Sequence, residues 1–374
     1  MAIEIRRVPI PHALGTPEST EFEAMVEVAA LVEESVWGHR RFAWDGYELL
    51  PLYRDDAYQG RRAFTAWDAG RCVGRVECTW ELADDAATID LVLGVLPDAR
   101  RRGTGSALLA AAHRVADELG RGILTAMSDV PARALEAPGD RLEARDGSGS
   151  IPASDPGAAF ALHHGFRLAQ LERVSGLTVA GRTEEFAETA VGLEASATSY
   201  ALRSWIDRAP EELLDELAVA HAAMSTDPPA GTATYDEERW DAARVRAAEE
   251  QSLAGGRRSL VTAAVDDDGR VAGFTELQLP ADSASAFQWD TIVLKEHRGH
   301  RLGMRMKVAN LVLLARTAPD RTDVFTWNAD ENEHMLAINV ALGFTVRGLS
   351  ALWQLDPEPA AGADSADSGA TTGS

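Results

Sequence analysis

An internal repeat constrains the fold of this chain more than any other feature of its sequence. Residues 89–109 (IDLVLGVLPDARRRGTGSALL) correspond to residues 287–308 (FQWDTIVLKEHRGHRLGMRMKV), with Val95 over Val293 at an offset of 198. Two further landmarks recur in the same order: VGRVE (73–77) as AGFTE (272–276), and the HGF ending at Phe166 as the LGF ending at Phe344. Landmarks repeated in one order indicate a duplicated domain.

Each copy places an Arg/Gly-rich turn between an apolar strand and an amphipathic helix. In the first copy Arg100, Gly103 and Gly105 have the spacing R-x-x-G-x-G, and in the second the turn reads RGHRLG (298–303). Closely spaced glycines let successive main-chain N–H groups point into one concavity, and the helix dipole adds its positive end there. The pattern favours a phosphate-bearing ligand. The chain has no P-loop motif, and neither turn has the G-x-G-x-x-G dinucleotide fingerprint.

Strand, R-x-x-G-x-G/A turn, amphipathic helix and a short helix ending in G-F together resemble the GNAT acyltransferase superfamily, over roughly residues 3–178 and 200–356. The resemblance implies an α/β fold of two tandem GNAT-like domains, each a central mixed sheet flanked by helices. It also implies acetyl-CoA as co-substrate, with its pyrophosphate cradled by the turns, and no metal. The residues expected at this site are Val95, Arg100, Arg101, Arg102, Gly103, Thr104, Gly105 and Ser106 in the first copy, and Val293, Arg298, Gly299, His300, Arg301, Leu302, Gly303, Lys307 and Asn332 in the second.

Lys307 joins this set because the chain has only two lysines, Lys295 and Lys307, and both flank the second turn. An ammonium there can reach a phosphate. Asn332 precedes the short helix, where an Asn side chain is also a good helix cap, and we favour the cap.

The expected domain division follows the repeat. We expect a first domain over 1–179 with an inserted loop at 130–157, a linker at 180–198, a second domain over 199–356 and a disordered tail at 357–374. The insertion is rich in Pro, Gly and charge, and the tail has almost nothing to bury.

The composition limits which classes of ligand and binding partner are expected. The formal net charge of −23 disfavours nucleic acid and anionic membranes, and favours a cationic small-molecule amine as substrate. Two cysteines, Cys72 and Cys78, are too few for a disulfide framework or a zinc site. Neither a signal-peptide pattern nor an apolar run of membrane-spanning length is present, so we expect a cytoplasmic protein, as a monomer or a homodimer.

Direct acyl transfer from a thioester to an amine needs positioning, donors for the thioester oxygen and a proton acceptor. The family resemblance implies main-chain donors where the strand before each turn splays from its neighbour. The Tyr that the family usually has four residues before the glycine of G-F is replaced by Ala161 and Asn339. The candidate bases are the equivalent carboxylates Glu77 and Glu276, together with Asp290, which we favour because its strand enters the second turn.

The second copy is the better candidate for catalysis. It carries TWNADENEHMLAINVALGF (326–344), a polar strand end in which the resemblance places Asn328 beside the pantetheine arm. The first hypothesis is therefore an acetyl-CoA-dependent N-acetyltransferase with Asp290, Glu276 and Asn328 at its catalytic centre. The alternatives are an enzyme similar to mycothiol synthase, acting on a cysteinyl amine, and a ligand-sensing tandem protein that does not catalyse.

Overall fold

A computed structural model describes residues 3–54, 57–83, 85–194 and 199–357. In the first half the helices are α1 (Thr20–Trp37), α2 (Gly46–Arg54), α3 (Thr104–Leu119), α4 (Ala132–Leu135) and α5 (Pro156–His163). Its strands are β1 (Glu4–Arg7), β2 (Gln59–Asp68), β3 (Arg71–Glu81), β4 (Thr88–Val95), β5 (Ile123–Pro131), β6 (Arg141–Glu143), β7 (Ser150–Pro152) and β8 (Arg167–Thr178).

The second half repeats this order. Its helices are α6 (Thr183–Glu194), α7 (Leu214–Met224), α8 (Ala242–Ala254), α9 (Leu302–Thr317) and α10 (Glu333–Leu342). Its strands are β9 (Tyr200–Ile206), β10 (Arg258–Asp266), β11 (Val271–Leu279), β12 (Ser285–Val293), β13 (Asp323–Ala329) and β14 (Thr345–Leu355). The predicted α/β class, with a mixed sheet flanked by helices, is confirmed.

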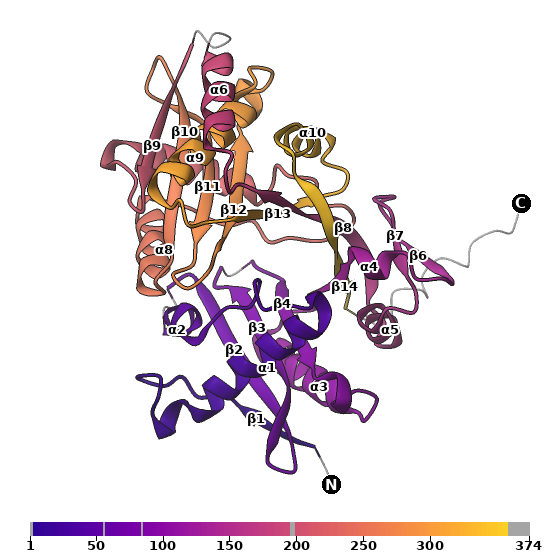
Figure 1. Ribbon diagram of the computed structural model, residues 1–374. Coiled ribbons are helices and arrows are strands. Elements are labelled where there is room, and N and C mark those ends of the chain that lie inside the picture. The colour runs from indigo at the N-terminus through magenta and orange to yellow at the C-terminus, as the bar shows by residue number, and fades with distance from the viewer. Residues whose placement is uncertain (1–2, 55–56, 84, 195–198, 358–374) are drawn as a thin grey trace, which may run out of the picture.

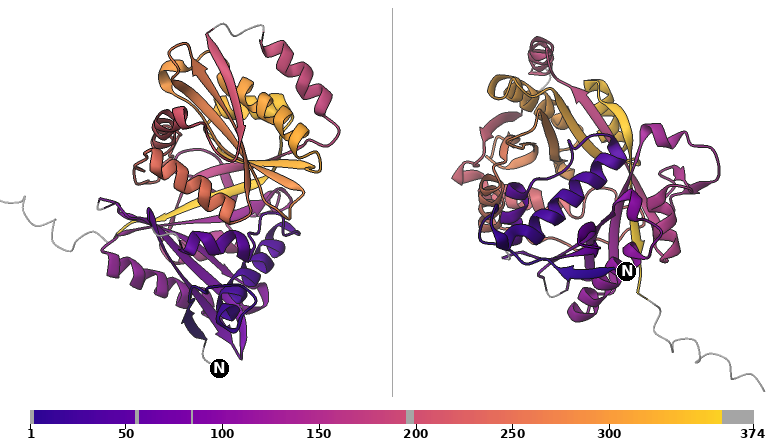
Figure 2. Two further views of the ribbon diagram at one scale, coloured as in Figure 1. Left: turned by 90° about the vertical axis from the view of Figure 1, so that its left-hand side faces the viewer. Right: turned by 60° about the horizontal axis from the view of Figure 1, so that its bottom comes forward.

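One sheet of twelve strands runs through both halves, in the order β1-β2-β3-β4-β5-β14-β8-β13-β12-β11-β10-β9. Its ladders are antiparallel except for two parallel pairs, β4–β5 and β12–β13, which occupy equivalent places in the two copies. Figure 1 shows the first half below and the second half above, with β8 and β14 crossing between them, and the left-hand view of Figure 2 shows the same stacking.

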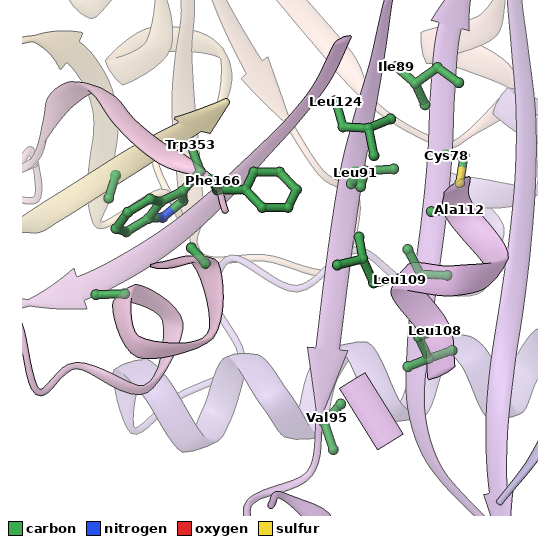
Figure 3. Packing of buried hydrophobic residues seen from close by; sticks show 14 of the residues in the cluster. Cys78, Ile89, Leu91, Val95, Leu108, Leu109, Ala112, Leu124, Phe166 and Trp353 are labelled. Atoms are coloured by element: carbon green, nitrogen blue, oxygen red, sulfur yellow. The ribbon is translucent and has the colours of Figure 1, made fainter. Parts of the chain in front are cut away.

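The last strands of the two copies are exchanged. β14 comes from the end of the second copy but pairs with β5 of the first, while β8 of the first copy pairs with β13 of the second. Trp353 of β14 is 1% exposed and belongs to a core cluster made otherwise mostly of first-half residues, beside Phe166 and Leu124 (Figure 3). Each half therefore completes the other half's core, and the boundaries at 179 and 199 stay a prediction about sequence units.

Helices cover both faces of each half of the sheet. In the second half the alternating side chains of β10 divide between two clusters, because Leu260 packs with α9 while Val261 packs with α7. In the first half α3 contributes to a cluster that also includes Val28 of α1, and α1 and α2 together supply a second cluster with Phe22, Met25 and Leu50. The turn that precedes α9 therefore lies on the face opposite α7 and α8.

Two connecting segments differ from expectation. Residues 183–194 of the predicted linker form α6, which packs on α9 and buries Phe186 and Leu193 among the residues of its core cluster. The segment 130–157 holds the end of β5, α4 and the β6–β7 hairpin, and Ile151 within it is fully buried. The predicted tail, apart from Pro357, lies outside the described residues. Among the described helices, none is long and apolar enough to cross a membrane.

Candidate functional site

The two Arg/Gly turns have the same backbone shape, although their glycines stand at different positions. Arg101 (φ 61°) and its counterpart Gly299 (φ 87°) are both left-handed, as are Gly103 (φ 84°) and its counterpart Arg301 (φ 57°). A left-handed arginine is uncommon, so its presence in each turn shows that the fold imposes this conformation. The Nε groups of the leading arginines make matching bonds: Arg100 donates to the Val95 carbonyl (2.9 Å) and Arg298 to the Val293 carbonyl (3.0 Å).

Both turns open onto a helix start that no side chain caps, since neither Gly103 nor Arg301 has a capping side-chain bond. The first main-chain N–H groups of α3 and α9 are thus not satisfied by a side-chain cap. The glycines inside the helices serve packing instead. A Cβ on Gly105 would meet the Phe160 ring at 2.8 Å, and one on Gly303 would meet Ile338 at 3.2 Å. These glycines let α5 and α10 pack closely against the helices that follow the turns.

The other predicted turn residues separate into buried supports and exposed groups. Thr104 and Leu302 are buried, and the Thr104 hydroxyl donates to the Ala99 carbonyl. Arg102 and Ser106 are exposed, and the Ser106 hydroxyl lies 3.0 Å from His164 Nε2. His300 is exposed beside the Tyr200 ring. The turns therefore bring the predicted set together, apart from Lys307 and Asn332.

Lys307 does not face the turn. Its side chain is 1% exposed inside the second half, and its ammonium donates to Asn339 Oδ1 at 2.9 Å. Burial lowers the pKa of Lys307 to about 7. This placement gives no support to the predicted phosphate contact. Asn332 accepts from the Met335 amide at 3.1 Å and so has the geometry of a helix cap.

Both halves open a splay between their parallel strands. β4 and β5 pair from Thr88 to Leu91 and then separate, although β4 continues to Val95. β12 and β13 pair only as far as Phe287 and Phe325. Beyond these points the main-chain groups of β4 and β12 that face β5 and β13 make no ladder bonds with them. Each splay lies just before its Arg/Gly turn, as the family resemblance implies.

A cavity of about 820 Å³ lies between the two halves. Side chains of α1, α2, β2 and β3 line it from the first half, and side chains of α7, α8, β10, β11 and β12 line it from the second. Eight carboxylates line this cavity, against four arginines. This excess of negative charge suits a cationic ligand. Four tryptophans add apolar surface to the cavity: Trp44, Trp205, Trp240 and Trp289.

The second half brings three titratable groups together on the cavity wall. Glu276 lies opposite a bulge in β12, because Thr275 pairs with Thr291 while Leu277 pairs with Gln288, so Trp289 and Asp290 face one residue. Bulges often re-aim side chains beside active sites. His221 of α7 approaches Asp290, with 3.5 Å between Nδ1 and Oδ2. Burial, and then the Asp290 charge, raise the pKa of Glu276 to about 7.

The equivalent carboxylate of the first half is already paired. Glu77 accepts from the Tyr53 hydroxyl at 2.5 Å and forms an ion pair with the partly buried Arg75. β4 has no bulge there, because its register with β3 is unbroken from Gly74 to Thr79. Nearby, burial and the Asp129 charge raise the pKa of Glu33 to about 8. The two halves are therefore unequal: of the equivalent carboxylates Glu77 and Glu276, Glu276 is the one with no arginine or lysine of the described segments bonded to it.

Sequence reasoning missed His221, Tyr53 and Glu33. They lie on α7, α2 and α1, helices that carry no motif. His221 and Glu33 line the cavity, while Tyr53 is buried and bonded to the cavity residue Glu77. His221 is held by its ring contacts, stacked on Trp240 with 4.4 Å between centroids and tilted against Phe274 at 4.5 Å. A lone histidine on an amphipathic helix gives no sequence signal for such a placement.

Comparison with known proteins agrees with this geometry. The sequence model of the acetyltransferase (GNAT) family matches residues 30–135. A solved tandem GNAT protein from the clavulanic acid biosynthesis pathway is 26% identical, with 95% of this chain and 99% of that chain covered and a TM-score of 0.71. No match was found among curated protein sequences.

Two more distant solved structures share the fold. A GCN5-related N-acetyltransferase from Sphaerobacter thermophilus is 15% identical, with 95% of both chains covered and a TM-score of 0.58. The N-myristoyltransferase of Saccharomyces cerevisiae with bound myristoyl-CoA is 8% identical, with 95% and 79% covered and a TM-score of 0.54.

Proposed function

We propose that this chain is a tandem acetyltransferase of the GNAT superfamily, which transfers the acetyl group of acetyl-CoA to the amine of a small cationic molecule, with the second half catalytic. The observation that carries this proposal is the cavity beside the second splay. Glu276, Asp290 and His221 line it where β12 enters the Arg/Gly turn. A thioester held in that splay would meet an amine in the cavity.

The turn residues suit acetyl-CoA. The uncapped N-terminus of α9 offers main-chain N–H groups and a positive dipole end to a diphosphate. The exposed side chains of Arg298 and Arg301 add positive charge beside it. The first turn has the same shape, so we propose a second binding site at α3 without catalysis.

The side chains of the second half suit direct transfer to an amine. Acetyl-CoA supplies the acyl group as a thioester, from which a thiolate of pKa near 8.5 is a tolerable leaving group. Glu276 accepts the proton that the substrate ammonium loses before its nitrogen attacks. A carboxylate with a pKa of about 7 is both available and basic enough for this role at neutral pH. Main-chain amides of β12 beyond Phe287 polarise the thioester carbonyl.

The test is acetyl transfer by the full chain. The protein is incubated with acetyl-CoA and a panel of small primary amines, and both free thiol and N-acetylated product are measured. We expect amine-dependent thiol release, faster with amines that carry a second positive charge than with amines that carry a carboxylate. If acetyl-CoA binds by calorimetry but no amine raises thiol release above the amine-free rate, the protein senses its ligand and does not catalyse.

Charge reversal in the turns tests the cofactor sites. Gly299→Glu and Gly103→Glu are each expected to weaken CoA binding at their own turn by about tenfold or more, because a carboxylate faces the diphosphate. The matched controls are Gly299→Arg and Gly103→Arg. Each places the residue that the other copy carries at the same left-handed position, so backbone strain is equal and only the charge differs. Calorimetry counts the sites, and equal loss with Arg and Glu would contradict the phosphate role.

A further inference from the structure

The buried ammonium of Lys307 stands at the end of a directed chain of side-chain hydrogen bonds. Lys307 Nζ donates to Asn339 Oδ1 at 2.9 Å, and Asn339 Nδ2 donates to Asn328 Oδ1 at 2.7 Å. The Thr326 hydroxyl also donates to Asn328 Oδ1, at 3.3 Å. Lys307 and Asn339 are 1% and 2% exposed, so water does not compete with these bonds.

A lysine at the end of such a chain determines its direction. An amide side chain offers a donor at one end and an acceptor at the other, and either orientation fits the same space. Below its pKa of about 7, Lys307 is charged and offers only N–H donors, so it meets Asn339 only through the oxygen. The Asn339 nitrogen must then face Asn328, which meets it with oxygen. The Asn328 NH₂ group then points away from this row of hydrogen bonds.

Asn328 stands on β13 beside the second splay. Asn328 is three residues beyond Phe325, the last β13 residue that pairs with β12. Its side chain is half-buried and shares a face of β13 with Val324, which packs in the α9 cluster. Within the described part of the chain, Asn328 Nδ2 donates to no other group, although its oxygen accepts two bonds.

We infer that Lys307 is a positioning residue that orients Asn339 and Asn328 so that Asn328 presents two N–H donors to a carbonyl oxygen of the pantetheine arm. This inference rests on the proposed use of the second splay by acetyl-CoA. Lys307 carries the only buried ammonium among the described residues, and this orienting role requires no contact between that ammonium and the ligand. The hydrogen bond between residues 339 and 328 would reverse its direction if the atom of residue 339 that faces Asn328 became an acceptor.

Asn339→Asp makes that reversal with almost no change in shape. Its carboxylate accepts from Lys307, which keeps the ammonium paired, and accepts from Asn328, whose amide must turn over. Asn328 then presents its oxygen to the splay. The binding test is run at pH 6, where Lys307 is charged, on a protein whose first turn is blocked by Gly103→Glu. Calorimetry with acetyl-CoA is expected to show at least about tenfold weaker binding. Asn328→Asp should weaken binding similarly, because it also presents oxygen.

Two readouts separate orientation from general damage. In ¹H–¹⁵N spectra without ligand, the Asn328 side-chain amide protons should exchange rapidly with water in the wild type and more slowly in Asn339→Asp. In an Asn328→Ala background, Asn339→Asp should cost no further affinity. Unchanged amide exchange, or an affinity loss that persists in the Asn328→Ala background, would overturn the inference. Slowed exchange with unchanged acetyl-CoA affinity would support the orienting role and count against the splay as the cofactor site.

Discussion

Glu276→Gln is expected to lower the rate of acetyl transfer by about 10²–10⁴-fold, the usual contribution of a positioned general base. The amide keeps the shape of the side chain and removes its proton affinity. Acetyl-CoA affinity should stay within about twofold, because Glu276 lines the acceptor cavity and not the turn. The measurement is the steady-state rate against amine and acetyl-CoA concentration, with calorimetry as the binding control.

The pKa of Glu276 determines how activity should change with pH. The pKa of Glu276 is raised to about 7, so activity should rise with pH through an acid limb near 7, and Glu276→Gln should remove that limb. Asp290 raises this pKa by its charge, so Asp290→Asn should move the limb to lower pH while most activity remains. If Asp290 is the base instead, Asp290→Asn will abolish the limb and Glu276→Gln will not.

The matched control lies in the other half. Glu77 occupies the equivalent strand position but is bonded to Tyr53 and Arg75. Glu77→Gln should therefore leave the acid limb near 7 in place. Loss of turnover from Glu77→Gln alone would place catalysis in the first half.

Lys307→Met is expected to raise the free energy of unfolding at pH 6–7 and to lose this advantage as pH rises. The pKa of Lys307 is lowered from 10.5 to about 7 by burial. Between these values the unfolded chain holds a proton that the folded chain has released, so wild-type stability gains about 1.4 kcal/mol per pH unit from this group. The methionine variant lacks this gain.

Chemical denaturation of both proteins at pH 6.5, 8 and 9.5 measures the effect. The difference between variant and wild type isolates this group, because other titrations are shared. We expect the variant's relative stability to fall by about 4 kcal/mol over this range at most, from three units at 1.4 kcal/mol each. A difference that does not change with pH would show that the ammonium is not buried in solution. The unpaired Asn339 oxygen offsets part of the gain at low pH by about 1–3 kcal/mol.

The repeat made the two turns predictable from sequence, and the family resemblance implied the splays. The spacing of Arg100, Gly103 and Gly105 recurs near Arg298, and a strand, a turn and a helix in order define their own local geometry. Even the non-identical positions agree, since Arg101 and Arg301 adopt the backbone of the glycines that they replace. Local interactions are enough to fix the shape of each turn, because a turn and the first helical residues lie within about ten positions of each other.

The base assignment was less predictable. Sequence favoured Asp290 over Glu276 because its strand enters the turn, and that preference stays untested. The environment of each carboxylate depends on residues far along the chain: Arg75 and Tyr53 surround Glu77, while Asp290 and His221 lie beside Glu276. A pKa follows from burial and nearby charges, and neither can be read from strand position alone.

The sequence by itself determined the duplication and where each turn would form, because these depend on short-range periodicity and spacing. The α/β fold and the two splays were expected only from the resemblance to the GNAT superfamily. The tertiary structure alone decided three things: that β8 and β14 are exchanged between the halves, that both halves line one cavity, and that Lys307 points into the core toward Asn339 instead of toward the turn. All three depend on which distant surfaces pack together. These contacts join segments that lie far apart in the sequence, so no local sequence pattern predicts them.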